Sequence, residues 1–276
     1  MSQTWRGAEP PAPRAVTRAG LLRVAGRGGA ILALLAIGFP LLVILRLPER
    51  LIFGLDRPVT PHVTQMVCRA ACRVLGLRVK IRGAPMRGPG AYVANHVGWL
   101  DIFVLNACKR LYFVAKSEVA GWPGIGWLAR GTGTVFIARD PKQAQAQTRV
   151  FEDRLRAGHR LLFFPEGTST DGRRVLPFKP TLFQAFLSDR LRDVLHIQPV
   201  TMIYHAPAGE DARFYGWWGD MALGPAILSV LAARRQGQVE VVYHLPLKVS
   251  DFHDRKALAA ASEAAVRKGF VAALAS

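Results

Sequence analysis

A histidine and a carboxylate follow one apolar stretch at a spacing that suits general-base chemistry. Residues 95–101 read N-H-V-G-W-L-D directly after a run of small apolar residues. An imidazole titrates near neutral pH, and a nearby carboxylate can orient its ring and stabilise its protonated form. Five positions along a regular helix turn through about 500°, which would place the two side chains on different faces. We therefore expect His96 in a turn at a strand end and Asp101 in the first turn of the next helix.

The spacing alone is a weak signal, because short motifs often match by chance. His205 has Glu210 at the same offset, and we interpret that pair as a coincidence within a loop. The other five histidines have no acid at this offset and are expected to be structural or exposed.

A second motif, F-F-P-E-G-T-S-T at residues 163–170, also follows an apolar run. Pro165 and Gly167 favour a tight turn that a ligand can approach closely, and Thr168 offers a hydroxyl. Glu166 would repel a phosphate unless basic groups meet it. Arg173, Arg174 and Lys179 are close enough in sequence to do so. An ordinary surface turn is the alternative.

A third motif, G-T-V-F-I-A-R-D at residues 133–140, ends in Arg139. The planar guanidinium of an arginine at a strand end is suited to binding a phosphate or a carboxylate. A salt bridge from Arg139 to Asp140 is the alternative. A fourth segment, I-Q-P-V-T at 197–201, is either part of the site or a core strand.

The elements that position these motifs are short strands alternating with helices. Strands are expected at 78–82, 90–94, 111–115, 133–138, 160–164, 197–203 and 239–245, and helices at 99–109, 123–131, 141–157, 180–191 and 253–274. This alternation predicts an α/β fold, a layered mixed sheet with flanking helices. We expect a basic arm and membrane anchor at 1–60 and one catalytic domain at 61–276.

The four motifs, in this order and separation, resemble those of the membrane-bound glycerolipid acyltransferases, over about residues 78–205. They are most similar to the 1-acylglycerol-3-phosphate acyltransferases. The stretch S-T-D-G-R-R-V-L-P-F-K at 169–179 is also similar to the branch that acylates lyso-ornithine lipids. Two departures are Gly98, often serine in the family, and Ala138, frequently aspartate.

The resemblance implies that His96, oriented by Asp101, takes the proton of an acceptor hydroxyl that attacks an acyl thioester. The thioester would be on acyl carrier protein or coenzyme A, with no other cofactor and no metal. The substrate-binding residues it implies are Asn95, Arg139, Pro165, Glu166, Gly167, Thr168 and Lys179. No G-x-S-x-G motif is present, so direct transfer is expected.

Two acceptors fit these residues. Arg139 can bind the phosphate of a lysophosphatidate, whereas a lyso-ornithine lipid offers a carboxylate for Arg139 and an amine for Glu166. The basic residues after the second motif favour the more anionic phosphate, so lysophosphatidate ranks first. A membrane lipid-binding protein without activity is the non-enzymatic alternative.

The N-terminal part predicts attachment to a membrane. Residues 1–27 contain five arginines and one acid, which suggests a flexible basic arm. Residues 28–45 are uncharged, a length that can just cross the hydrocarbon core. Pro40 leaves two possibilities open, a kinked spanning helix or a broken segment in one leaflet. For 63–75, a stripe of Val63, Met66, Val67, Ala70 and Val74 predicts a helix lying on the core or on the membrane.

The composition agrees with this interpretation. The chain has 276 residues, half of them hydrophobic, with a formal charge of +18. Basic, apolar chains are typical of proteins on anionic lipid, and we expect membrane lipid and acyl carrier protein as partners but no nucleic acid. Three cysteines exclude a disulfide framework. We expect the bacterial inner membrane, with the catalytic domain facing the cytoplasm.

Overall fold

The computed structural model describes residues 4–11, 15–88, 90–138, 144–188 and 190–275, and their centre is an eight-stranded mixed sheet. The strand order is β1-β7-β6-β2-β5-β3-β4, and β8 pairs with β6. β6 is antiparallel to β7 and β8, and all other pairs are parallel. The strands are β1 (Arg78–Arg82), β2 (Gly90–Ala94), β3 (Tyr112–Lys116), β4 (Val135–Ile137), β5 (Leu161–Phe163), β6 (His196–His205), β7 (Gln238–Tyr243) and β8 (Leu247–Lys248).

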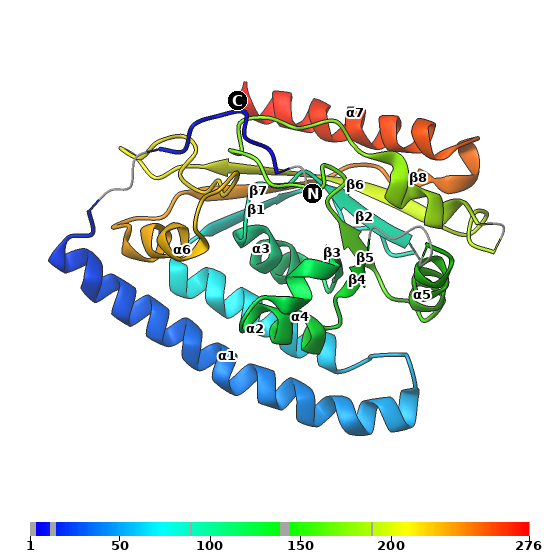
Figure 1. Ribbon diagram of the computed structural model, residues 1–276, viewed down its shortest axis with the longest axis horizontal. Coiled ribbons are helices and arrows are strands. Elements are labelled where there is room, and N and C mark those ends of the chain that lie inside the picture. Colours follow the sequence, from blue (N-terminus) through cyan, green and yellow to red (C-terminus); the bar gives the residue numbers. More distant parts are fainter. Residues whose placement is uncertain (1–3, 12–14, 89, 139–143, 189, 276) are drawn as a thin grey trace.

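Helices cover both faces of the sheet (Figure 1). The α-helices are α1 (Arg18–Phe53), α2 (Thr60–Leu75), α3 (Leu100–Cys108), α4 (Ile125–Thr132), α5 (Ala144–Arg156), α6 (Leu223–Ala232) and α7 (Arg255–Leu274). The 3₁₀ helices are η1 (Ser117–Gly121), η3 (Pro180–Leu187) and η4 (Val249–Asp251). α7 and η3 lie on one face; α2 and α3 lie on the other, with α1 outermost.

Each central strand contributes side chains to two hydrophobic cores, one on each face of the sheet. Along β2, Ala91 and Val93 belong to the core beneath α7, whereas Tyr92 belongs to the core beneath α2 and α3. A strand that is buried on both faces is apolar throughout its length. This explains why the central strands were predicted correctly from short apolar runs.

One expected helix has a different type, and one helix was not expected. Residues 180–187 form a 3₁₀ helix rather than the expected α-helix at 180–191, and α6 was not predicted. α6 begins at Leu223, and the Gly-Pro pair that follows resembles a turn signal in the sequence.

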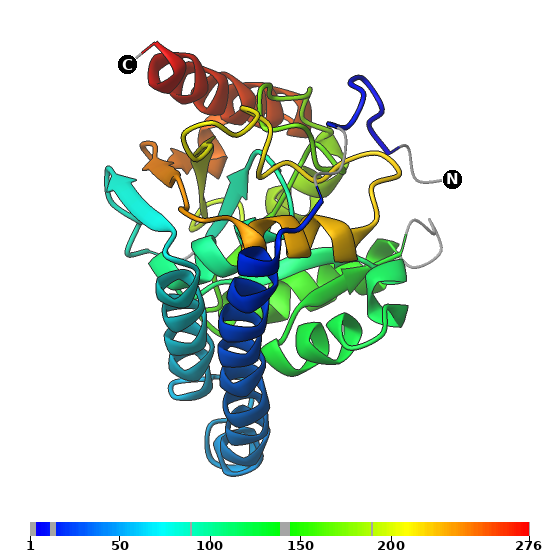
Figure 2. The ribbon, with the colours of Figure 1, turned by 90° about the vertical axis from the view of Figure 1, so that its left-hand side faces the viewer.

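The apolar N-terminal segment is one continuous helix that does not break at Pro40. α1 has 36 residues and packs against α2 as an antiparallel hairpin (Figure 2). A Cβ placed on Gly38 would lie 2.5 Å from Cγ2 of Val67, so the glycine allows close approach of the two helices. α1 is the one helix of the described chain that is long and apolar enough to cross a membrane, and it lies near the N-terminus.

The predicted apolar stripe of α2 is displaced around the helix. Met66 is exposed, and Val67, Ala70 and Val74 are half-buried. The buried face consists of Val63, Cys68, Ala71, Cys72 and Leu75. α2 lies between α1 and α3, so of the two possibilities considered, packing on the core is what the structure shows. The cysteines act here as small apolar side chains, and burial raises the pKa of Cys72 to about 11.

Candidate active site

His96 and Asp101 meet as a hydrogen-bonded pair where β2 ends and α3 begins. The distance from His96 Nδ1 to Asp101 Oδ2 is 2.8 Å, and Asp101 is fully buried. Oδ2 also accepts the backbone N–H groups of Val97 (2.7 Å) and Gly98 (3.1 Å). The turn therefore holds the carboxylate, and the carboxylate holds the imidazole. With Nδ1–H donated to the carboxylate, Nε2 carries the lone pair that a general base needs.

The His96 ring is also stacked on Phe164. The two ring centroids are 3.9 Å apart and the planes differ by 11°. Phe164 directly follows β5, which pairs with β2 in parallel, so the carboxyl ends of both strands lie at the same edge. The stacking leaves 20% of the His96 side chain exposed. Phe164 was not predicted as a site residue, because its contact with His96 depends on which strands pair.

Glu166 holds the backbone of this turn. Its Oε1 accepts the N–H of His96 at 2.8 Å, and its Oε2 accepts the N–H of Leu176 at 3.0 Å. Burial raises the pKa of Glu166 to about 8, while the two backbone donors oppose that shift. With 1% of Glu166 exposed, its carboxylate connects two loops instead of facing an acceptor headgroup. This placement differs from the role expected from the sequence.

Asn95 is likewise engaged within the protein. Its Nδ2 donates to the carbonyl oxygen of Met202 (2.9 Å), and its Oδ1 accepts the N–H of Met202 (2.7 Å). The side chain is fully buried and acts as an extension of the β2–β6 ladder. The structure thus places Asn95 beneath the site, whereas we expected it to bind substrate.

The P-E-G-T turn lies beside the dyad. Pro165 is buried, and its carbonyl oxygen accepts the N–H of Lys179 at 3.0 Å. Gly167 has φ +70°, and Nζ of the exposed Lys179 lies against it. Of the expected acceptor-binding groups, Gly167, Thr168 and Lys179 are therefore the ones with accessible surface. Arg139 lies outside the described residues.

The N-terminal arm lies on this turn and is not a free extension. Trp5 N–H donates to Thr168 Oγ1 at 3.2 Å, and its ring lies 6.2 Å from that of Trp218. The Arg174 guanidinium lies 4.9 Å from the Trp5 ring and also pairs with the buried Asp171 at 3.0 Å. Residues 4–11 thus contact the body of the protein, contrary to the flexible arm expected from the sequence.

Tyr204 on β6 is a second residue that the sequence analysis missed. Its buried hydroxyl faces the Asp101 carboxylate, and burial followed by the Asp101 charge raises its pKa well above the usual value. Within the described part of the chain, neither this hydroxyl nor Asp101 Oδ1 has a partner at normal hydrogen-bond geometry.

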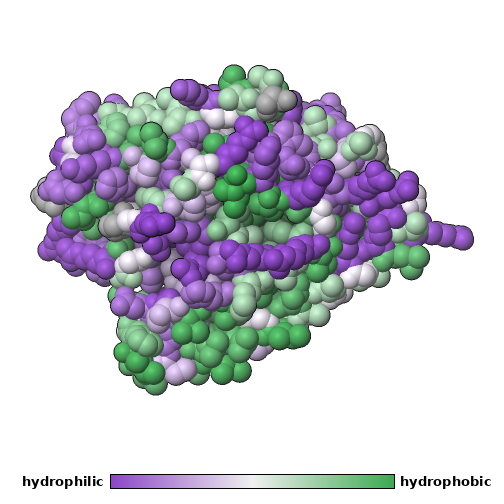
Figure 3. Space-filling model, turned by 180° about the vertical axis from the view of Figure 1, so that it is seen from behind, coloured by the Kyte–Doolittle hydropathy of each residue, from purple (hydrophilic) through white to green (hydrophobic). Residues whose placement is uncertain are grey.

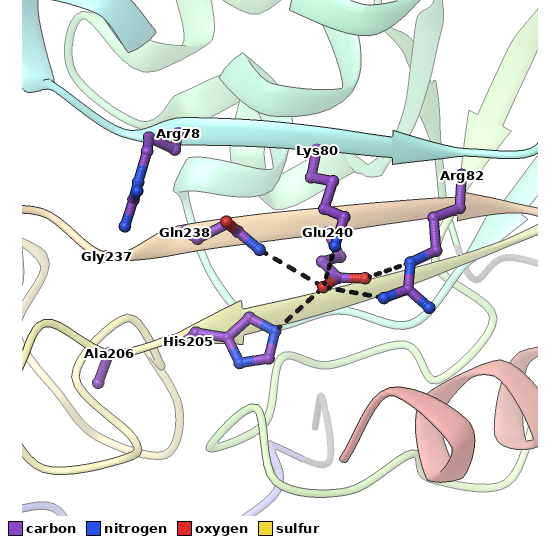
Figure 4. A pocket seen from close by; sticks show the side chains of 8 residues that line it. All are labelled: Arg78, Lys80, Arg82, His205, Ala206, Gly237, Gln238 and Glu240. Carbon is purple, nitrogen blue, oxygen red and sulfur yellow. Dashed lines mark hydrogen bonds and ion pairs between the residues drawn. The ribbon is translucent and has the colours of Figure 1, made fainter. Parts of the chain in front are cut away.

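His205 lies away from the His96–Asp101 pair. It lines a basic pocket at the β1 edge of the sheet, where it points toward Glu240 at 3.7 Å (Figure 4). Arg82 (2.8 Å) and Lys80 (3.5 Å) on β1 also contact Glu240. Charged side chains on an edge strand are a common protection against pairing with other sheets. Within the described chain, no three potential ligand side chains form a metal-binding group.

The fold and the site define an α/β enzyme with a histidine–aspartate pair at the ends of parallel strands. A family model described as Acyltransferase matches residues 77–203. A lyso-ornithine lipid O-acyltransferase of Rhodobacter capsulatus is 60% identical over 265 residues, 96% of each chain. A 1-acyl-sn-glycerol-3-phosphate acyltransferase of Neisseria gonorrhoeae is 31% identical over 195 residues, 70% of this chain and 74% of the relative. The chain belongs to the acyltransferase family.

A solved structure supports the fold. The 1-acyl-sn-glycerophosphate acyltransferase of Thermotoga maritima matches with a TM-score of 0.65 at 21% identity, covering 93% of this chain and 97% of that one. The predicted layered mixed sheet of the glycerolipid acyltransferase type is confirmed, as is the resemblance found in the motifs.

Proposed function

We propose that this acyltransferase transfers a fatty acyl group to the free hydroxyl of lyso-ornithine lipid. The observation that carries the proposal is the 60% identity, over nearly the whole chain, to an enzyme named for that acceptor. A relative of Pseudomonas aeruginosa with the same name is 33% identical over 89% of this chain. Relatives named for 1-acylglycerol-3-phosphate are more distant, and lysophosphatidate stays the second candidate.

This reverses the ranking that we made from charge alone. That ranking counted Arg174 among the groups available to a phosphate. In the structure its guanidinium is bound to Asp171 by two hydrogen bonds, of 3.1 and 3.0 Å, and lies 4.9 Å from the centroid of the Trp5 ring. A paired arginine adds little attraction for a phosphate. The local charge therefore favours the phosphate acceptor less than the sequence suggested.

The dyad suits direct transfer. His96 Nε2 would accept the proton of the acceptor hydroxyl as its oxygen attacks the thioester carbonyl. Asp101 would stabilise the imidazolium, which then returns the proton to the departing thiolate, so the products are an ester and a free thiol. The N–H groups of His96, Val97 and Gly98 are already bound to Glu166 and Asp101. Other donors must therefore meet the oxyanion.

The donor and the location are part of the same proposal. An acyl thioester of acyl carrier protein or coenzyme A supplies the acyl group, and α1 attaches the enzyme to the bacterial inner membrane with the site facing the cytoplasm. The apolar surface of α1 supports attachment (Figure 3). The exposed residues on it include Leu32, Ile37, Leu41, Ile44, Leu47, Leu51 and Ile52.

A competition experiment tests the acceptor. Purified enzyme receives acyl-carrier-protein thioester with equal amounts of lyso-ornithine lipid and lysophosphatidate, and mass spectrometry resolves the products. We expect ornithine lipid to dominate. Phosphatidic acid as the main product would restore the first ranking, and binding of either lysolipid without any product would favour the lipid-binding alternative.

A further inference from the structure

Three arginines lie together at the amino end of β3, the end of the parallel strands that is opposite the dyad. Arg46 comes from α1, Arg57 from the connection between α1 and α2, and Arg154 from α5. They surround Tyr112, the first residue of β3. The guanidinium carbon of Arg154 lies 4.5 Å from the centroid of the Tyr112 ring, and that of Arg57 lies 5.4 Å from it. His96 follows the opposite, carboxyl end of the parallel strand β2.

The charges of this arginine cluster are not balanced within the described chain. Glu49 is the carboxylate that forms an ion pair in it, 3.4 Å from Arg46 Nε. Its oxygens are also occupied by Val59 N–H (2.6 Å) and by the N–H (3.0 Å) and hydroxyl of Thr60. One carboxylate, paired with Arg46, therefore accompanies three guanidinium groups, and uncompensated buried charge is costly.

Arg57 is the member with a buried nitrogen that finds no hydrogen-bond partner among the described residues. Arg46 donates to Thr60 Oγ1 at 3.0 Å, and Arg154 donates to the Gly133 carbonyl at 2.9 Å. Arg57 Nη1 is buried, and no group in the described part of the chain accepts its hydrogen bond. Stacking on Tyr112 orients the guanidinium of Arg57 but leaves this donor unsatisfied.

Burial and the excess positive charge lower the pKa values of two groups outside α1. His159 is 5% exposed and accepts from Arg154 Nε. Burial, followed by the charges of Arg154, Arg57 and Arg46, lowers the pKa of His159 to about 3, so the imidazole stays neutral. Burial, then Arg57, lowers the pKa of Arg154 to about 10. An anion entering this cluster would relieve the repulsion.

The cluster lies beside the apolar end of α1. Leu51 is 87% exposed, Ile52 71% and Phe53 48%, and Leu55 follows in the connection. Apolar side chains next to guanidinium groups match a lipid, whose chains lie beside its headgroup. A guanidinium can bind a phosphate with two parallel hydrogen bonds.

We propose that Arg46, Arg57 and Arg154 bind the phosphate group of an anionic membrane lipid, whose chains lie along the exposed end of α1. This site is separate from the acceptor site at the dyad, and it rests on the proposed attachment of α1 to the membrane. The lipid would complete the charge balance where the hairpin meets the catalytic domain.

Thermal unfolding tests the site on the full-length protein in detergent. Phosphatidylglycerol, phosphatidylcholine or inorganic phosphate is added at matched ionic strength, and Tm is recorded. We expect phosphatidylglycerol to raise Tm of the wild type by about 2–4 °C or more. Phosphatidylcholine and inorganic phosphate should not. An equal effect of phosphatidylcholine would overturn the proposal, and an equal effect of inorganic phosphate would show a site for free phosphate instead.

The matched variants are Arg57→Gln and Arg50→Gln. Arg50 is exposed in the last turn of α1, and among the described residues no hydrogen bond or ion pair joins its side chain to the cluster. Arg57→Gln should lose the phosphatidylglycerol shift, and Arg50→Gln should keep it. Without lipid, Arg57→Gln should be at least as stable as the wild type, because it removes one of three crowded charges.

Two results would contradict the assignment. The first is that Arg57→Gln retains the full lipid shift. The second is that Arg57→Gln unfolds without lipid, which would make Arg57 a structural residue. Acyl transfer by the wild type is measured in parallel. Its absence would count against the proposed function and would leave the Tm comparison intact.

Discussion

His96 is fixed from three sides, and each contact has a separate origin in the sequence. Asp101 binds Nδ1, Phe164 stacks on the ring, and Glu166 binds the backbone N–H. The first contact is local, whereas the other two depend on the pairing of β2 with β5. A base held in this way loses little conformational entropy when substrate binds.

Asp101→Asn should lower kcat strongly with the fold retained. An amide cannot stabilise the imidazolium, and it favours the wrong tautomer of His96. In a comparable serine-protease triad, the same change costs ~10⁴ in kcat. We expect a loss between tenfold and ~10⁴, with lysolipid KM little changed, in steady-state kinetics. Activity within twofold of the wild type would contradict the dyad.

The raised pKa of Glu166 predicts that the stability difference between the wild type and Glu166→Gln depends on pH. Its folded pKa of about 8 lies above the ordinary value of 4.5. Protonated Glu166 therefore makes its full contribution to the stability of the fold below pH 4.5, and this contribution is lost as the pH rises through 8. Glutamine does not titrate, so Tm of Glu166→Gln minus Tm of the wild type should grow by about 2–4 °C or more between pH 5 and 8.5. A constant difference, measured by calorimetry, would show that Glu166 is ionised throughout.

The sequence predicted the dyad because five residues of spacing and a strand end decide its geometry. It could not predict that Asn95 and Glu166 turn inward. Polar side chains beside a catalytic residue look alike in sequence whether they bind substrate or a backbone N–H. Their direction depends on Met202 and Leu176, which are distant in the chain.

At the scale of elements, the α1–α2 hairpin depends on a close approach at Gly38. Gly38→Ala would place a methyl group 2.5 Å from Val67 Cγ2 and should cost about 1–3 kcal/mol through overpacking. Gly29→Ala is the matched control, since its Cβ would meet nothing within 4 Å. Because alanine favours helix, the control should gain about 0.5–1 kcal/mol. Equal Tm values for the two variants in detergent would contradict this packing.

Helix ends and faces were harder to predict than strands. The buried face of α2 carries Cys68 and Cys72, which the stripe of larger apolar residues concealed. Val67, a member of the predicted stripe, lies against Gly38 of α1, so the stripe partly marks the contact of α2 with α1 and not with the core. When a helix packs against two partners, apolar residues lie on two faces, and their spacing no longer indicates one buried face. Pro40 suggested a break, yet α1 continues through it.

At the scale of the whole molecule, the exposed apolar end of α1 should hold the enzyme on lipid. Leu51→Glu with Ile52→Glu should reduce vesicle binding more than about tenfold, since each buried aliphatic side chain contributes about 1.5–3 kcal/mol. Val271→Glu is the control. Val271 is a 66% exposed residue on α7, on the far side of the sheet (Figure 1). Flotation with vesicles measures the binding, and equal flotation of all three proteins would contradict the attachment.

The central claim is that His96 is the base of an acyl transfer, and thiol release tests it most directly. Wild-type enzyme, His96→Ala and His205→Ala receive acyl thioester and lyso-ornithine lipid, and free thiol and acylated product are counted together. We predict one thiol per product for the wild type and for His205→Ala. His96→Ala should be slower by ~10²–10⁴. Retention of more than about a tenth of the rate by His96→Ala, outside that range, would contradict the account.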